Sequence, residues 1–377
     1  ALANQSQLRY FCLKTKNKMD FPARTVCDTD YDASIFQSTP EEDLRGMVVC
    51  NTTGRVIIPK MTITEEYTSA GEFTEKVLTN ESGGDCSDDW SAHLALEGTI
   101  VRVFHHGGEW RCATMRKLDA DLSSWMSGES FGKRFRLAVL RRILQCVGDD
   151  TCACGFCSDP ARRDQLASEQ YAQTFLPSLV PDRTYVFLIR SVFSNRQVNY
   201  ATLPTVYVVA TIRTDTASET GFVYEFQGET LAIPYAESIP DPEVLRDTTF
   251  LDAVSDELDT TSVQGIVAYS RLAPWRCAKL YSRAYGALLA VRGNSPSIPL
   301  RFVELLACNE TGGSDKLVAM FPEYAERLAE IETRLRVLTS SIHSMYMAIK
   351  VQRRFNETPA RIAPVITSCH RWHLRDR

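Results

Sequence analysis

The stretch Ala95-Leu96-Glu97-Gly98-Thr99-Ile100-Val101-Arg102-Val103-Phe104 decides how the rest of the chain is interpreted. Thr99–Phe104 and Glu109–Thr114 predict two strands of a hairpin, joined across His105-His106-Gly107-Gly108. Residues two apart in a strand point to the same face, so His93 is expected to share a face with Ala95. We expect His93 to be a packing histidine, and a nucleophilic role for it is the alternative.

Composition places the chain among soluble globular proteins. It has 377 residues, of which 44% are apolar and 24% charged, and this length predicts two or three domains. The formal net charge of −5 does not by itself indicate nucleic-acid binding. Local charge is uneven, with five basic groups in 131–142, twelve acids against two arginines in 213–260, and seven basic groups against two acids in 350–377. We expect these runs to form solvated faces.

Targeting signals are not evident. Apolar runs stay below the roughly eighteen residues of a membrane-spanning helix, so membrane insertion is not expected. The first residues, Ala-Leu-Ala-Asn-Gln-Ser-Gln, lack the basic and apolar regions of a secretory signal peptide. Because the sequence starts without Met, it is expected to be processed or incomplete at that end.

Cysteine usage leaves alternatives open. Eight of the twelve cysteines are scattered singly, which favours free thiols in a reducing compartment. The others cluster as Cys146, Cys152, Cys154 and Cys157. Four thiolates at close spacing can hold zinc, but the usual second pair about fifteen residues away is missing. Zinc, local disulfides and free thiols in a loop therefore all remain open for this cluster.

Hydrophobic patterns predict a mixed α+β domain followed by a helical tail. Four further strand-like runs are Thr184–Ile189, Thr205–Ile212, Gly221–Phe226 and Val263–Tyr269. From about Ser130 the pattern is helical, and the apolar face is formed by Phe131, Phe135, Val139 and Ile143. The acidic stretch 236–260 is expected to be a loop with a short helix.

The tail carries a heptad repeat. Its apolar positions, spaced alternately three and four residues apart, are Leu328, Ile331, Leu335, Leu338, Ile342, Met345 and Ile349. They predict one long helix from about Pro322 to Arg354. The helix is expected to pack within a helical domain, and an oligomer formed through residues 322–354 is the alternative.

Several segments in order resemble RNA ligases of the phage RNA ligase type, as found in large DNA viruses of eukaryotes. Leu44-Arg45-Gly46-Met47-Val48-Val49 and Gly54-Arg55-Val56-Ile57-Ile58-Pro59-Lys60 resemble the strand pair that precedes that family's nucleophile. Later segments resemble the remaining motifs, namely Glu97–Phe104, Thr114–Ala120, Trp125–Gly132, Tyr185–Leu188 with Asn195-Arg196, Gln264–Val267, Ala278–Leu280, Tyr285 and Arg292–Asn294. The match covers about residues 40–310.

This resemblance implies a fold. It is an α+β nucleotidyltransferase domain of the RNA/DNA ligase, ATP-grasp-like kind, with antiparallel sheets around a nucleotide cleft over residues 1–305. A helical C-terminal domain over residues 306–377 is expected to follow it. Fold alone does not transfer function.

The same resemblance locates a missing nucleophile. Such ligases attack ATP with a lysine in a Lys-x-Asp/Glu-Gly pattern, and here that pattern is Ala95-Leu96-Glu97-Gly98. A methyl group cannot form the lysyl-AMP bond. Ala95 therefore occupies the nucleophile position, and no catalytic residue is assigned.

Other motifs depart from the family in the same direction. The third motif has no carboxylate between Asp182 and Asp215, and the fifth has Cys277-Ala278-Lys279 in place of Lys-x-Lys. The metal-holding Glu of the fourth motif is Gln264, whose carbonyl can coordinate a cation but adds no charge, so divalent-ion binding should weaken.

Part of the implied pocket remains. The resemblance assigns nucleotide contacts to Glu97, Gly98, Arg102, Lys117, Arg196 and Lys279, and phosphate or nucleic-acid contacts to Arg45 and Lys60. The alternative for each cation is a solvent-facing or salt-bridged strand residue. ATP and Mg²⁺ are implied as cofactors only if the pocket works.

Two functions follow as hypotheses. The first is a catalytically degenerate RNA-ligase-like protein of a large DNA virus, with a structural or nucleic-acid/nucleotide-binding role, in the virion or the host cytoplasm. Its expected partners are the RNA or DNA phosphate backbone and capsid or other viral proteins. The alternative is an active ATP-dependent RNA ligase in which Ala95 is an engineered change or another residue supplies the nucleophile.

Overall fold

The chain divides into two compact units, Ala1–Leu289 and Ala290–Arg377. The computed structural model describes residues 8–10, 45–78, 90–125, 128–144, 160–190, 198, 204–214, 222–226, 233, 236, 239, 242–258, 263–271, 276–295, 297–308, 312–353 and 360–375. The division falls inside helix α5 (Arg283–Arg292), earlier than the boundary expected between residues 305 and 306. The reason is that α6 (Ile298–Cys308) packs against helices α7 and α8 of the second unit.

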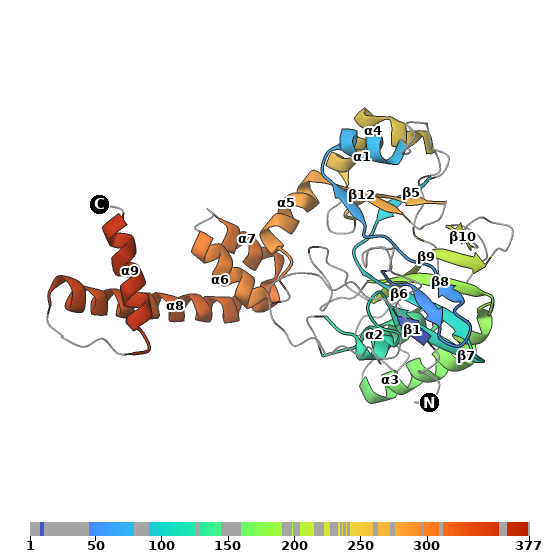
Figure 1. Ribbon diagram of the computed structural model, residues 1–377, viewed down its shortest axis with the longest axis horizontal. Helices are drawn as coiled ribbons and strands as arrows, with labels where there is room; N and C mark the ends of the chain where they lie inside the picture. Colours follow the sequence, from blue (N-terminus) through green and yellow to red (C-terminus); the bar gives the residue numbers. More distant parts are fainter. Residues whose placement is uncertain are drawn as a thin grey trace. The chain divides into compact units, whose positions relative to one another are not determined.

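The described strands of the first unit form three sheets, and Figure 1 shows how these strands are arranged. The three-stranded sheet has the order β1 (Leu8–Tyr10), β2 (Val48–Cys50), β3 (Val56–Ile58). The five-stranded sheet has the order β10 (Phe222–Glu225), β9 (Thr205–Thr214), β8 (Arg183–Arg190), β6 (Thr99–His106), β7 (Glu109–Thr114). The four-stranded sheet has the order β4 (Glu65–Tyr67), β12 (Cys277–Tyr281), β11 (Gly265–Ser270), β5 (Trp90–Ala95). All these pairings are antiparallel except β12 with β4, which is parallel.

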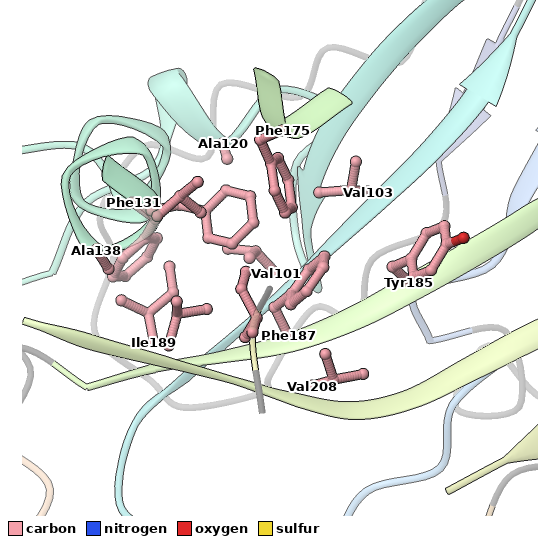
Figure 2. Packing of buried hydrophobic residues seen from close by; sticks show 14 of the residues in the cluster. Val101, Val103, Ala120, Phe131, Ala138, Phe175, Tyr185, Phe187, Ile189 and Val208 are labelled. Atoms are coloured by element: carbon pink, nitrogen blue, oxygen red, sulfur yellow. The ribbon is translucent and has the colours of Figure 1, made fainter. Parts of the chain in front are cut away.

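One face of the five-stranded sheet is covered by helices. These are η5 (Ala120–Leu122), α2 (Phe131–Leu144), the π-helical turn η6 (Tyr171–Phe175) and η7 (Leu176–Ser178), and α3 (Pro160–Gln170) packs against α2 and η6. Figure 2 shows Phe131, Phe175 and Phe187 packed together in this core. Phe131, Phe135 and Val139 are buried on α2 as the four-residue spacing predicts, and Ile143 packs beside them.

The four-stranded sheet has an apolar core on each face. On one side it packs against α1 (Ala70–Leu78), η8 (Pro242–Arg246) and α4 (Thr248–Glu257). On the other side, residues of β5, β11 and β12 share a cluster with residues of the five-stranded sheet. Along β5, Trp90 and Ala92 belong to the helix-covered core, whereas Ala95 belongs to the cluster between the sheets, as strand alternation requires.

The α+β fold class with antiparallel sheets is confirmed. The hairpin is also confirmed, because β6 and β7 pair from Val101 opposite Thr114 to His106 opposite Glu109. In the acidic stretch, α4 is the short helix that the sequence predicts, and Asp247 caps it by accepting from the backbone N–H of Phe250 at 3.0 Å.

The second unit is helical. After α6 it contains α7 (Gly313–Met320), η9 (Pro322–Tyr324), α8 (Ala325–Tyr346), the π-helical turn η10 (Met347–Val351) and α9 (Ala363–Arg375). Of the positions in the heptad stripe, Leu328 is fully buried, Leu338 is 53% exposed, and the others are half-buried. An oligomer through this stripe stays a prediction. No helix in the described part of the chain has the length and apolar character needed to span a membrane.

Candidate functional site

Ala95 lies at the end of β5, in the packed layer between the two larger sheets. It pairs with Gly265 of β11, and its carbonyl accepts from the backbone N–H of Gln264 at 2.7 Å. Its side chain is 1% exposed and belongs to an apolar cluster that includes Met61, Leu188, Val209, Val267 and Cys277. The position that resembles the ligase nucleophile is therefore a methyl group in a closed apolar environment.

A chain of hydrogen bonds runs beside Ala95, and we call its four side chains the Glu97–Lys279 relay. Lys279 Nζ donates to Gln264 Oε1 at 2.9 Å, and Gln264 Nε2 donates to the Tyr285 hydroxyl at 2.6 Å. That hydroxyl donates to Glu97 Oε2 at 3.0 Å, where the backbone N–H of Val198 also donates at 3.0 Å. The members come from the loop after β5, the residue before β11, β12 and α5.

The direction of the relay is fixed by chemistry. An ammonium only donates and a carboxylate only accepts, so the amide and the hydroxyl between Lys279 and Glu97 must each accept from the Lys279 side and donate towards Glu97. Burial, and after it the charge of Glu97, raises the pKa of Tyr285, which keeps its hydroxyl protonated. Lys279 Nζ also lies 5.4 Å from the ring centroid of Tyr281. The relay thus holds one cation and one anion that are joined through neutral groups.

Two glycines allow the backbone to close around this site. A Cβ atom on Gly98 would lie 2.5 Å from the carbonyl oxygen of Ile189 and 2.9 Å from Leu188 Cγ. On Gly265, whose φ is +152°, a Cβ would lie 1.9 Å from the carbonyl oxygen of Leu280. Both positions therefore require glycine for backbone approach, whatever ligand the site holds.

Arg102, expected to contact nucleotide, lies inside the protein instead. Its side chain is fully buried, with Nη1 donating to the carbonyl of Gly46 and Nη2 donating to the carbonyl of Thr114 at 2.7 Å. It thereby joins the turn before β2 to the end of β7. Glycine is favoured at position 46 because its φ of +71° is a left-handed conformation that other residues rarely adopt. This geometry gives Arg102 a structural role and does not present its guanidinium to an anion.

The remaining predicted cations are spread over the first unit. Lys117 is exposed and its Nζ donates to the carbonyl of Leu122. Arg45 and Lys60 are half-buried, and the carbonyl of Arg45 accepts from the backbone N–H of Met61 at 3.0 Å, so the two segments run together. Arg196 and the cluster Cys146, Cys152, Cys154 and Cys157 lie outside the described residues. Lys279 is the cation that the structure brings together with Glu97.

His93 is the packing histidine that its position predicts. Its Nε2 lies 2.9 Å from Ser91 Oγ and its Nδ1 lies 3.4 Å from the carbonyl of Ala236. The rings of Phe226 and Tyr269 flank it, with centroids at 5.9 and 5.5 Å. Burial lowers the pKa of His93 to about 4, so the ring is neutral at pH 7.

The site does not fit a divalent cation. In the described part of the chain no three His, Cys, Asp or Glu residues are grouped as metal ligands. Gln264, the expected weak ligand, uses both amide atoms within the relay. One buried carboxylate is a poor set of oxygen ligands for Mg²⁺, so these residues support no metal-dependent step.

The chain is similar in sequence to viral proteins, and among solved structures it is similar to ligases. No family model matches the chain. The chain is 24% identical over 282 residues to an immediate-early protein ICP-46 homolog of Invertebrate iridescent virus 6, covering 71% of this chain and 54% of that protein. It is 24% identical over 343 residues to the homolog of Invertebrate iridescent virus 3, covering 89% and 67%. The chain thus spans about half the length of the first of these curated relatives.

Among solved structures, the chain is similar to an archaeal ATP-dependent RNA ligase. The TM-score is 0.38 at 10% identity, covering 77% of this chain and 64% of that one. It is also similar to a Naegleria gruberi RNA ligase with PPi, at a TM-score of 0.33 and 12% identity, covering 60% and 56%. The α+β class itself rests on the sheets described above.

Sequence reasoning did not find the centre of the site. The ligase resemblance includes Tyr285 but assigns it no role, although its hydroxyl joins Gln264 to Glu97. The contact with Glu97 spans 188 positions in the sequence, so no local spacing could have revealed it. The backbone N–H of Val198 also donates to Glu97, and because it is a main-chain group, the residue type at position 198 could not indicate this contact.

Proposed function

We propose that this chain is a nucleotidyltransferase-like protein that forms no covalent nucleotide adduct and serves as a virus-encoded binding protein for nucleic acid. The observation that carries the proposal is the burial of Ala95 at the position of the ligase nucleophile. A methyl group has no lone pair with which to attack a phosphate. Nucleophilic catalysis in the manner of the ligases is therefore absent.

The Glu97–Lys279 relay supports this proposal. A catalytic pocket needs polar groups that are free to meet charge as it develops on the substrate. Here Glu97 already accepts two hydrogen bonds, and Lys279 already donates to Gln264. The residues that would bind nucleotide instead satisfy one another, an arrangement that is stable without a ligand.

We also propose that the protein is encoded by a virus and that its role is to bind nucleic acid. The relatives in the two iridescent viruses are immediate-early proteins by name, which favours a role in the infected cell over one in the virion. Arg45, Lys60 and Lys117 stay proposed as phosphate contacts that would add affinity without reading sequence. Capsid proteins, Arg196 and the cysteine cluster take no part in the proposal.

The deciding experiment is incubation of the purified chain with α-labelled ATP and Mg²⁺, followed by denaturation. We expect no label to remain on the protein. A denaturation-resistant label would overturn the proposal in favour of an active ligase with another nucleophile. His93, the nucleophilic side chain nearest to Ala95 on the same strand, is packed and neutral and offers no support for that alternative.

The Ala95→Lys variant serves as a second arm. Because position 95 is buried and the relay is closed, we expect this variant also to remain unlabelled. A label on Ala95→Lys would show that the cleft still admits ATP, which contradicts the closed relay. Circular dichroism of the variant must match that of the parent chain for its result to count.

A further inference from the structure

The second unit ends in two helices that pack across each other. Helix α9 lies across α8 (Figure 1), and the Tyr346 hydroxyl of α8 lies 3.2 Å from His370 Nδ1 of α9. The ring of His373 also lies against Tyr346, with centroids 6.3 Å apart. Ile366, which shares this side of α9, is buried. The inner face of α9 is therefore formed by Ile366, His370 and His373.

The opposite side of α9 is open, and we call it the outer face. At about 100° per residue, the positions opposite Ile366 are Pro364, Ser368, Arg371 and Arg375. All four are exposed. Trp372 adjoins this row and is 67% exposed, which is unusual for so large an apolar side chain. Arg371 and Arg375 lie one turn apart, so their Cα atoms are separated by about 6 Å along the helix axis.

The outer face belongs to a strongly basic segment. The described residues 333–353 and 360–375 contain no Asp or Glu. Five exposed cations have no ion pair within the described part of the chain, and they are Lys350, Arg353, Arg361, Arg371 and Arg375. The segment thus carries positive charge that no acidic side chain among the described residues neutralises.

The basic run on α2 is different, although the sequence alone does not distinguish the two. Arg136 binds both carboxylate oxygens of Asp121 at 2.8 and 2.9 Å. Lys133 lies 2.7 Å from a carboxylate oxygen of Asp164 and 3.3 Å from one of Glu129. Lys133 and Arg136 are therefore engaged with carboxylates of the fold, unlike the cations of the outer face.

We propose that the outer face of α9 binds a single-stranded polynucleotide. Arg371 and Arg375 contact consecutive phosphates, and a base stacks on the indole of Trp372. Cations that follow the backbone together with an exposed aromatic ring are the chemistry of sequence-tolerant single-strand binding. The outer face would supply a surface for the proposed binding role, but it does not depend on the chemistry at Ala95, because the two are tested by separate measurements.

A lipid surface fits the outer face less well. Helices that lie in a membrane interface present one continuous apolar face. On α9, Val365 and Trp372 lie on one flank and Leu374 lies on the other, with Arg371 and Arg375 between them. A polyanion can lie along this row, whereas a bilayer would have to bury the two arginines between apolar groups.

The test is fluorescence polarisation of the full chain with fluorescein-labelled single-stranded RNA or DNA of about 20 nucleotides over a range of salt concentrations. We expect Arg371→Gln/Arg375→Gln to weaken binding at least about tenfold and to lower the salt slope by about 1.4. Trp372→Ala should weaken binding about tenfold with an unchanged salt slope, and Trp372→Phe should recover part of the loss. Similar results with RNA and DNA are expected, because neither the phosphate contacts nor the stacked base reads the ribose.

The matched control removes the same charge elsewhere on the second unit. Arg334 and Arg336 of α8 are exposed and pair with Glu330 and Glu332. Arg334→Gln/Arg336→Gln should therefore leave affinity unchanged within about twofold. Equal losses from both double variants, or no loss from Trp372→Ala, would overturn the proposal. The proposal would also be overturned if the chain bound phosphatidylserine vesicles but not the oligonucleotides, and if Trp372→Ala abolished the vesicle binding.

Discussion

The hydroxyl of Tyr285 donates a hydrogen bond to Glu97 across 3.0 Å, although the two residues are 188 positions apart in the sequence. This contact ties helix α5 to the loop that follows β5. Because Gln264 donates to the same hydroxyl, the tyrosine also carries the connection to Lys279. The residues that resemble a nucleotide pocket in sequence therefore form an internal brace, by which we mean the hydrogen bonds that hold α5, β12 and the loop after β5 together within the first unit.

Replacing Tyr285 with Phe should lower the free energy of unfolding by about 2 kcal/mol, because it deprives Glu97 of one donor and leaves a buried Gln264 amide without its acceptor. Urea denaturation measures the change. Tyr207→Phe is the control, since the half-buried Tyr207 makes no side-chain hydrogen bond within the described residues. Equal losses in the two variants would show that the relay adds no stability.

Substitution of Gly98 by Ala should destabilise the chain by about 1–3 kcal/mol, because the new Cβ meets the backbone oxygen of Ile189, which cannot swing away as a side chain can. Gly286→Ala within α5 should have the opposite sign, because a Cβ there meets nothing within 4 Å and alanine favours helix. Thermal unfolding of both variants decides the point. Tolerance of Gly98→Ala would mean that the loop does not approach β8 as closely as described.

Arg102→Lys should reduce the free energy of unfolding by about 2–4 kcal/mol, because an ammonium cannot replace a guanidinium that bridges the carbonyls of Gly46 and Thr114. The exposed Arg116 provides the matched substitution, and Arg116→Lys should be nearly neutral. If Arg102→Lys instead left stability intact and altered nucleotide binding, the ligand role expected from sequence would be restored.

Acid should destabilise the chain partly through His93. Its pKa is lowered from 6.5 to about 4 on folding, so the unfolded chain binds a proton that the folded chain excludes between these pH values. Stability from this group is full above pH 6.5 and is lost as pH falls, by about 2 kcal/mol between pH 7 and pH 5. His93→Gln should flatten this part of the stability profile. Parallel profiles for the two proteins would contradict the burial of a neutral ring.

Local patterns predicted several of the local elements. The β6–β7 hairpin and the buried face of α2 followed from short-range alternation and four-residue spacing. The heptad predicted a helix through Leu338, but it did not predict that Leu338 would stay 53% exposed, since the same spacing serves a buried or an open stripe.

Contacts between segments far apart in the chain could not be predicted from the sequence. The pairing of β5 with β11 and the parallel pairing of β4 with β12 join segments that carry no mutual signal. The ligase resemblance brought Glu97, Gln264 and Lys279 under consideration but assigned them to a ligand. Arg102 was expected at the same site, whereas its side chain is bonded to two backbone carbonyls away from solvent.

The side-chain amide of Gln264 restricts which residues can replace it in the Glu97–Lys279 relay. The Tyr285 hydroxyl has a single hydrogen, which Glu97 receives, so residue 264 must be a donor towards it. A carboxylate at position 264 would place two acceptors against one hydrogen and add a second buried negative charge. An acidic residue at position 264 would therefore open the brace that α5 supplies. With this brace in place, introducing an acidic, cation-holding residue at position 264 would cost the first unit stability.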